Sequence, residues 1–262
     1  MIIDAHAHIW PDHIAPRVLA ERPVGLTPVG DGTMTGLLRT MDSAGVDVAC
    51  ALAVALSGAT VARTNEFIGS VDRDRLVPFG TVHTDLSIAQ NLAALADNGI
   101  TAVKFHPLFQ GIALDAPDVI ELMQALADGG IIVLAHAGAG GDAAATERGS
   151  PAKVAKLVAK VPNLTLIACH FGGYQLLDDA ERDVVGRRVV LETSWPPTVG
   201  ELDGRQIVDM IAQHGAQRVV YGSDWPMAEP QREIAAVRGW GLAAEDEAAV
   251  LGGNLARLLG LT

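Results

Sequence analysis

The pattern of apolar and polar residues divides the chain into short apolar runs that alternate with longer amphipathic segments. Runs such as Ile131-Ile-Val-Leu-Ala135 and Leu164-Thr-Leu-Ile-Ala168 are almost continuously apolar, which is typical of parallel strands covered on both faces. The runs predict strands at residues 2–8, 46–54, 76–83, 102–106, 131–136, 164–170, 189–194 and 218–223. The amphipathic segments predict helices at residues 35–44, 60–71, 88–98, 118–128, 151–161, 174–184, 201–214 and 232–238, with a further segment at 245–259.

Eight strands that each precede a helix have the order of a (β/α)8 TIM barrel, and such barrels of about 250 residues commonly form one domain. We therefore expect a single α/β domain over residues 1–262 with an extra C-terminal helix. A doubly wound open sheet also alternates strands with helices. However, the first strand is not followed by a G-x-G-x-x-G turn, and the glycines at 138–141 lack the spacing and the lysine of a phosphate-binding loop. The irregular residues 10–32, with four prolines, predict a long loop on the active face.

Most histidines fall where predicted strands end. Six of the eight occupy these positions, namely His6, His8, His83, His106, His136 and His170. In a (β/α)8 barrel the C-terminal ends of the strands open onto the face where active sites are built. A single histidine at a strand end is more often a hydrogen-bonded structural residue, but a converging set favours a functional site.

His6 and His8 are two residues apart on the first predicted strand. Side chains of a strand alternate with a period of two, so both imidazoles point to the same side and are able to bind one metal ion. His136, His170 and Asp224 end the fifth, sixth and eighth strands. Imidazole and carboxylate donors suit zinc, and also manganese or iron.

The motifs around these residues resemble the amidohydrolase superfamily of metal-dependent barrels, in the branch that contains 2-amino-3-carboxymuconate-semialdehyde decarboxylase, benzoate-type decarboxylases and many predicted hydrolases. The resemblance is carried, in the expected order, by DAHAH at 4–8, VKFHP at 103–107, LAHAG at 134–138, ACHFGG at 168–173, YGSDWP at 221–226 and the C-terminal GNLARLL from 253. It implies one metal ion held by His6, His8, His136 and Asp224. It also implies that His170 is the acid–base residue beside a metal-activated water.

These roles agree with elementary chemistry. A divalent cation lowers the pKa of water to about 7 and polarises a substrate oxygen. A histidine, with an ordinary pKa of about 6.5, exchanges a proton with that water or with the reacting group. Asp224 either binds the metal ion or acts as a general base without binding it, and we favour the role of metal ligand.

Lys104, near the end of the fourth predicted strand, has three possible roles. It either holds a substrate carboxylate, forms a carboxylated bridge between two metal ions, or pairs with a structural acid. We favour contact with the substrate, because one metal ion is usual in the branch that the chain resembles. A carboxylated Lys104 would make His170 a metal ligand.

Further residues are expected to contact the substrate or to support the site. His106 is expected to line the pocket, with a hydrogen bond to a neighbouring loop as the alternative. Trp10, Trp195 and Trp225 follow strands one, seven and eight and are expected to form an apolar wall for the substrate, with packing beneath the loops as the alternative.

Three other side chains near the strand ends carry predictions, two of them from strand parity. Asp4 shares the parity of His6 and is expected to orient one of the metal ligands. Cys169 has the opposite parity to His170 and is expected to point away from it, as a small buried residue. Glu192 either lines the mouth of the barrel or pairs with an arginine.

Composition narrows the class of protein. The formal charge is −12 and no basic stripe is present, so nucleic acid is not an expected partner. The chain has neither an apolar run of about 18 residues nor the start of a signal peptide, so no membrane partner is expected. Its two cysteines lie in apolar runs, which excludes a disulfide scaffold and favours the cytoplasm. A homodimer is expected on the resemblance alone.

The leading hypothesis is a metal-dependent hydrolase that uses metal-activated water on a small lactone, amide or ester, with zinc as the expected ion. The alternative is a metal-dependent non-oxidative decarboxylase of an aromatic or muconate-type acid, since the same metal site serves both reactions. A hypothesis from another class is a non-catalytic barrel that binds a ligand through the same face.

Overall fold

The protein is described by a computed structural model over residues 1–21 and 25–261. Its strands form one sheet in which each strand is hydrogen-bonded to the next in sequence order. These strands are β1 (Ile3–His8), β2 (Val48–Leu52), β3 (Leu76–Thr81), β4 (Ala102–Phe105), β5 (Ile132–Ala135), β6 (Leu166–Ala168), β7 (Val190–Glu192) and β8 (Val219–Val220). This order, with helices between successive strands, is that of a (β/α)8 barrel, so the predicted fold class is confirmed.

The first strand also adjoins the last strand and the residues that follow it. The Ala5 N–H donates to the Tyr221 carbonyl at 2.9 Å, and the Asp224 N–H donates to the His6 carbonyl at 2.8 Å. Ala7 and Trp225 form a parallel bridge. A sheet whose first and last strands meet has the topology of a barrel, and this contact excludes the doubly wound open sheet.

The strands are shorter than the sequence predicts, mainly at their C-terminal ends. His83, His106, His136 and His170 therefore lie one or two residues beyond β3, β4, β5 and β6. The apolar runs continue past the point at which the backbone leaves the sheet, so they do not mark the strand end. The His106 N–H, for example, donates to the Gln110 side chain at 2.8 Å.

All the predicted helices are present, with ends that shift by a few residues. They are α2 (Met34–Ala44), α3 (Gly58–Gly69), α4 (Ile88–Ala96), α6 (Pro117–Asp128), α8 (Pro151–Lys160), α9 (Leu177–Asp183), α10 (Gly204–His214) and α11 (Pro230–Gly239). The C-terminal segment consists of α12 (Ala244–Ala248), a π-helical stretch η4 (Ala249–Gly253) and α13 (Asn254–Leu259). The expected extra helix is therefore confirmed.

Several short helices were not predicted. These are α1 (Ala15–Ala20), α5 (Pro107–Gln110), α7 (Ala143–Arg148) and the 3-10 turns η1 (His170–Gly172), η2 (Val199–Glu201) and η3 (Ala216–Arg218). Local caps start three of them: the Asp142 side chain accepts from the Ala145 N–H in α7, the His106 ring from the Phe109 N–H in α5, and the Thr198 side chain from the Gly200 N–H in η2. Such helices are too short to show a helical period. Residues 10–32, predicted to be a loop, contain α1.

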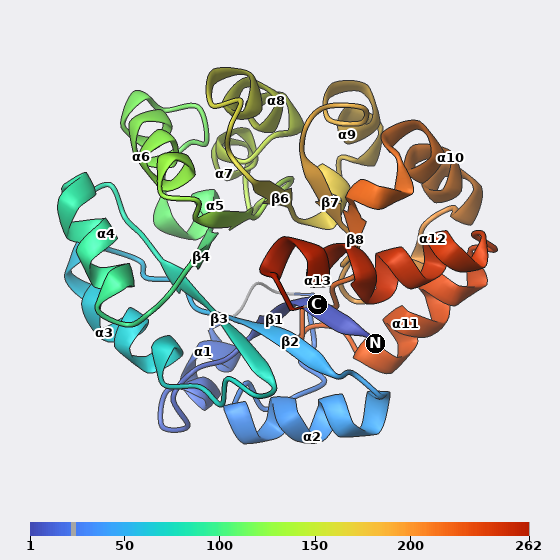
Figure 1. Cartoon of the computed structure of the whole chain (residues 1–262), viewed down its shortest axis with the longest axis horizontal. Helices are drawn as coiled ribbons and strands as arrows, with labels where there is room; N and C mark the ends of the chain where they lie inside the picture. The colour runs from blue at the N-terminus through green and yellow to red at the C-terminus, as the bar shows by residue number, and fades with distance from the viewer. Residues whose placement is uncertain (22–24, 262) are drawn as a thin grey trace. The chain divides into compact units, whose positions relative to one another are not determined.

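Contacts group the chain into two compact units, which are described separately. The first comprises residues 1–51, 72–77 and 192–262, and the second comprises residues 52–71 and 78–191. In the first unit η4 and α13 contact β1 and β8, and the Asn254 side chain donates to the carbonyls of Ala216 and Val219 at 2.8 Å each. In the second unit β4, β5 and β6 pair in parallel, with α6 against β5 (Figure 1). The single domain expected over residues 1–262 stays a prediction.

Gly138, after β5, allows its backbone to lie close to the backbone of Tyr174. Its φ is +114°, it forms a parallel bridge with Tyr174, and a Cβ at this position would overlap the Tyr174 backbone. The glycine is thus required by packing.

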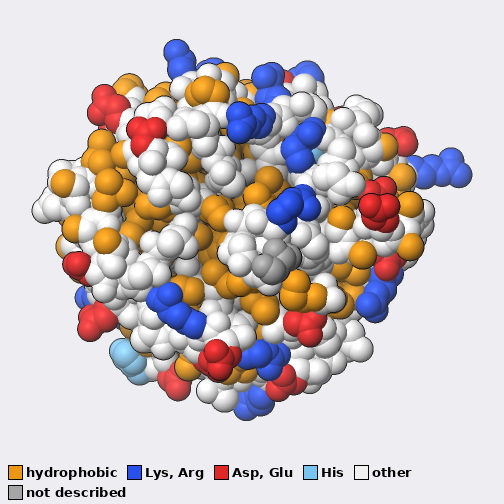
Figure 2. All heavy atoms as spheres, viewed as in Figure 1, with side chains coloured by type: hydrophobic (Ala, Val, Ile, Leu, Met, Phe, Trp, Pro, Cys, Tyr) orange, Lys and Arg blue, Asp and Glu red, His pale blue; other side chains and the backbone are white. Residues whose placement is uncertain are grey.

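The described part of the chain has no helix long and apolar enough to cross a membrane. On the face drawn in Figure 2, acidic and basic side chains are intermixed. Cys50 and Cys169 are buried and not joined in a disulfide, as the sequence predicts.

A buried acid connects α11 to η2 in the first unit. Glu233 is 1% exposed, and its Oε2 accepts a hydrogen bond from the Val199 N–H at 2.9 Å. Burial raises the pKa of Glu233 from 4.5 to about 7, because a charged carboxylate is poorly solvated in the interior.

Glu233 is therefore expected to make stability depend on pH. Between pH 4.5 and about 7 the folded protein holds a proton on Glu233 that the unfolded chain has released. The contribution of this neutral carboxyl to the free energy of unfolding is fully present below about pH 4.5 and is lost as the pH rises through about 7. The total loss is at most about 3 kcal/mol. Urea unfolding of the wild type and Glu233→Gln from about pH 5 to about pH 8 measures this difference. A difference between the two proteins that stays constant with pH would contradict it.

Candidate metal centre

Three of the predicted metal ligands meet in the first unit. Nε2 of His6 lies 3.2 Å from Nε2 of His8 and 3.2 Å from Oδ1 of Asp224. Nε2 of His8 lies 3.6 Å from the same Oδ1. His6 and His8 come from β1, as the alternation of its side chains predicts, and Asp224 follows β8. Two imidazoles and one carboxylate therefore face a common point.

The spacing of these donor atoms fits a divalent metal ion. Ligand bonds of about 2.0–2.1 Å in a tetrahedral zinc site place donor atoms about 3.4 Å apart. The three separations in the structure, 3.2, 3.2 and 3.6 Å, lie around this value. Two nitrogen donors and one oxygen donor also match the ligands that zinc, manganese and iron take in proteins.

Asp224 is held in an uncommon backbone conformation. Its φ is +64°, in the left-handed region that residues other than glycine, asparagine and aspartate seldom adopt. Backbone hydrogen bonds on both sides of the residue hold it there: its N–H donates to the His6 carbonyl, and its carbonyl accepts from the Met227 N–H, each at 2.8 Å. Such conformations cluster at functional sites, which supports a functional role for Asp224.

Asp4 contacts the backbone of a predicted ligand and not its imidazole ring. Its carboxylate accepts hydrogen bonds from the backbone N–H groups of His6 and Ser223, at 2.9 Å each, and from the Ser223 hydroxyl at 2.6 Å. These contacts hold the backbone of β1 to the residues after β8, and no described contact joins Asp4 to an imidazole ring. Burial raises the pKa of Asp4 to about 7. Parity places a side chain on one face of a strand but does not choose its partner.

The carboxylate at Nδ1 of His6 is that of Glu192, the last residue of β7. Its Oε2 lies 3.0 Å from Nδ1 of His6, and both side chains are at most 1% exposed. The sequence predicted that Glu192 either lines the barrel mouth or pairs with an arginine, and it did not predict the contact with His6. No local signal reveals it, because 186 positions separate the two residues.

The three predicted tryptophans have different surroundings. The Trp10 ring stacks on the His8 ring with their centroids 5.8 Å apart, so Trp10 lies beside the candidate ligands and is partly exposed. Trp225 is fully buried and packs against Gly30, as in the packing alternative. Trp195 is 8% exposed. Substrate contact by these residues stays a prediction.

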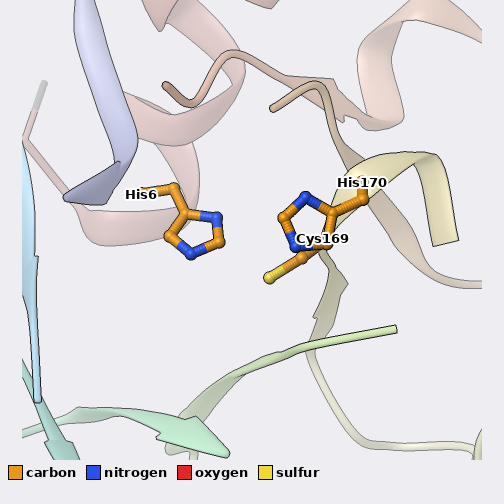
Figure 3. A group of neighbouring side chains, drawn as sticks. All are labelled: His6, Cys169 and His170. Carbon is orange, nitrogen blue, oxygen red and sulfur yellow. The ribbon is translucent and has the colours of Figure 1, made fainter. Parts of the chain in front are cut away.

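In the second unit, Lys104 on β4 is fully buried. Its Nζ donates to Sγ of Cys169 at 3.1 Å, a partner that none of the three predicted roles includes. The prediction that Cys169 points away from His170 is wrong, because both side chains reach the same place (Figure 3). Strand β6 ends at Ala168 and His170 has a φ of +59°, so the alternation of a strand no longer applies. Substrate contact by Lys104 stays a prediction.

His136 and His170 are neighbours in the second unit. Nε2 of His170 lies 3.1 Å from Nδ1 of His136. The two side chains are largely buried, at 8% and 2% exposed for His136 and His170 respectively. A ligand role for His136 would thus use its Nε2. Its participation in a metal centre, and that of His170 in proton transfer, stay predictions.

His106 forms the middle of an aromatic stack. Its ring lies parallel to that of Phe109, with centroids 3.8 Å apart, and to that of His136 at 4.3 Å. Gln110 holds the His106 backbone, because its Oε1 accepts from the His106 N–H at 2.8 Å. The Gln110 amide in turn donates to the carbonyls of Ala55 and Val82. Phe109 is 53% exposed and was not predicted as a site residue, since only its place in α5 brings it to His106.

Comparison with known proteins identifies the family of this chain. The amidohydrolase family model matches residues 3–261, whereas no curated protein matches the sequence. Similar solved structures include 5-carboxyvanillate decarboxylase from Sphingomonas paucimobilis, with a TM-score of 0.77 and 15% identity over 100% of this chain and 99% of that chain. Another is a probable 2-pyrone-4,6-dicarboxylic acid hydrolase from Acinetobacter baumannii, with a TM-score of 0.70 and 17% identity over 99% of each chain.

A third similar structure contains a metal ion. It is a dihydroxybenzoic acid decarboxylase from Polaromonas sp. JS666 with bound manganese and the inhibitor 2-nitroresorcinol, with a TM-score of 0.75 and 14% identity over 99% of this chain and 97% of that chain. At these identities the likeness shows the fold.

Proposed function

We infer that this chain, which belongs to the amidohydrolase family, is a metal-dependent hydrolase that acts on a small lactone, amide or ester. The family is one of metal-dependent enzymes, hydrolases or carboxy-lyases. The observation that carries the proposal is the convergence of Nε2 of His6, Nε2 of His8 and Oδ1 of Asp224, whose separations fit a divalent cation. We propose zinc as the resident ion, with manganese or iron as alternatives.

The chain's own residues then have distinct tasks. A bound divalent cation supplies Lewis acidity, which polarises a substrate oxygen and makes water acidic enough to attack near neutral pH. His6, His8 and Asp224 hold the ion, and His136 is proposed as a further ligand through Nε2. His170, whose Nε2 lies 3.1 Å from Nδ1 of His136, is proposed to exchange a proton with the attacking water or with the reacting group. An imidazole suits this task because its ordinary pKa is about 6.5.

Other residues are proposed to bind the substrate. Trp10, stacked on His8, offers an apolar surface beside the ligands. His106, which stacks on Phe109, is proposed to contact the substrate, and Lys104 is proposed to contact an anionic group of the substrate. We further propose that the protein is a cytoplasmic homodimer without nucleic-acid or membrane partners.

A second candidate function is non-oxidative decarboxylation. It is supported by the similarity of the fold to 5-carboxyvanillate decarboxylase and to a manganese-containing dihydroxybenzoic acid decarboxylase. The same ligand set serves either reaction, because in both a cation stabilises negative charge that develops on the substrate. The substrate and product therefore decide between them.

Removal of the metal is expected to abolish turnover, and zinc or manganese is expected to restore it. The test treats the protein with a chelator, exchanges the buffer, and assays apo and reconstituted samples against lactones, esters and amides, with aromatic carboxylic acids in parallel. Release of acid from the first group supports the hydrolase, whereas release of carbon dioxide from the second supports the decarboxylase. Full activity of a metal-free sample would contradict both.

A further inference from the structure

The second ring nitrogen of His6 is engaged by a buried acid. Oε2 of Glu192 lies 3.0 Å from Nδ1 of His6, and the exposed fractions of the two side chains are 0% and 1%. A buried carboxylate must be matched by donors, since an unpaired charge in the interior is costly. The contact with His6 is therefore part of a built site.

Ser194 supplies two further donors to Glu192. Its hydroxyl donates to Oε2 at 2.8 Å, and its backbone N–H donates to Oε1. The same hydroxyl lies 3.2 Å from Nδ1 of His6. Both carboxylate oxygens are thus held by a residue two positions along the chain, which fixes the direction from which the carboxylate meets the imidazole.

Gly222, between β8 and Asp224, leaves the space for this carboxylate. A Cβ at this position would overlap Oε1 of Glu192 and lie 2.8 Å from its Cδ, closer than real contacts allow. The glycine of the YGSDWP motif is therefore explained by the close approach of Glu192.

The Glu192 carboxylate favours one of the two neutral tautomers of His6. A carboxylate accepts hydrogen bonds, so it favours the tautomer with the proton on Nδ1. The lone pair of Nε2 is then directed to the place where Nε2 of His8 and Oδ1 of Asp224 lie, 3.2 Å away in each case. This tautomer is the one that binds a metal ion through Nε2.

We propose that Glu192 is a positioning residue that sets the tautomer and orientation of His6 and thereby the affinity of the centre for a divalent cation. Ser194 and Gly222 support it, the first by donating to the carboxylate and the second by leaving room for it. The proposal rests on the proposed metal-binding function of His6, His8 and Asp224.

Zinc affinity tests the proposal without a substrate. Competition with a chromophoric chelator gives the zinc Kd of the wild type, Glu192→Gln and Ser194→Ala. Loss of a carboxylate that orients a metal-bound histidine is expected to weaken binding about 10–100-fold, with a smaller loss for Ser194→Ala. Glu233→Gln is the matched control, because Glu233 is an equally buried acid of the same unit that contacts Val199. It is expected to keep the wild-type Kd.

Nitrogen-15 NMR of the metal-free wild type supplies a second readout that needs no variant. At about pH 8, where an ordinary histidine is neutral, we expect His6 to carry its proton on Nδ1. A proton on Nε2 of His6 would overturn the proposal, even where Glu192→Gln fails to fold. An unchanged zinc Kd in a folded Glu192→Gln would also overturn it. A wild type that binds no zinc would overturn the metal-binding function and this proposal together.

Discussion

Replacing Asp224 with alanine is expected to weaken zinc binding strongly and to lower kcat/KM at least about 1000-fold, which corresponds to about 4 kcal/mol of transition-state stabilisation. Oδ1 of Asp224 lies 3.2 Å from Nε2 of His6 and 3.6 Å from Nε2 of His8. The change removes the only carboxylate of this set and its negative charge, which attracts the cation. The measurements are the zinc Kd by chelator competition and steady-state kinetics on a substrate from the panel.

Two further variants give this experiment its controls. Asp209→Ala removes an exposed acid from α10 in the same unit and is expected to behave as the wild type. Asp224→Asn keeps the shape of the side chain but presents a neutral amide oxygen, a weaker metal ligand, and is expected to fall between alanine and aspartate in zinc affinity. Wild-type zinc affinity in Asp224→Ala would exclude ligation by this residue and favour its alternative role as a general base.

The metal content of the protein is expected to depend on His136 as strongly as zinc binding depends on Asp224. Purified without chelators or a metal-binding tag, the wild type is expected to hold about one metal ion per chain, as a mononuclear centre requires. His136→Ala is expected to hold far less, because it removes an imidazole donor. Elemental mass spectrometry of the two proteins in parallel gives the ratio of metal to chain.

Loss of metal in His136→Ala needs a control for weakly bound ions at the surface. His13→Ala removes an exposed imidazole and is expected to keep the wild-type content. A ratio of about two in the wild type would support a carboxylated, bridging Lys104. Wild-type content in His136→Ala would exclude His136 as a ligand.

Much of the fold followed from local pattern. Apolar runs of strand length, separated by amphipathic segments, predicted the eight strands and their helices, because the periods of buried positions differ between the two structures. The same reasoning predicted that His6 and His8 share a face of β1, and Nε2 of one lies 3.2 Å from Nε2 of the other. The short helices α5 and α7 were missed because a single turn shows no period.

The site could be predicted only as far as strand order and parity reach. Strand order predicted that Asp224 belongs with His6 and His8, since the ends of parallel strands in a barrel share a face. Parity failed for Cys169, because β6 ends before it and His170 has a positive φ. Parity placed Asp4 on the same face as His6, and Asp4 accepts hydrogen bonds from the backbones of His6 and Ser223, but parity gave no sign that Glu192 contacts the His6 ring.

The (β/α)8 order, the pairing of His6 with His8 and the family were thus predictable from the sequence, because each depends on local periodicity or on motifs along the chain. Three contacts were not predictable in this way: Glu192 with Nδ1 of His6, Lys104 with Cys169, and His106 with Phe109. Glu192 and Lys104 are buried groups whose partners are remote in sequence. Their choice of partner follows from the need to satisfy charge and hydrogen bonds in the interior, which is settled by packing in three dimensions.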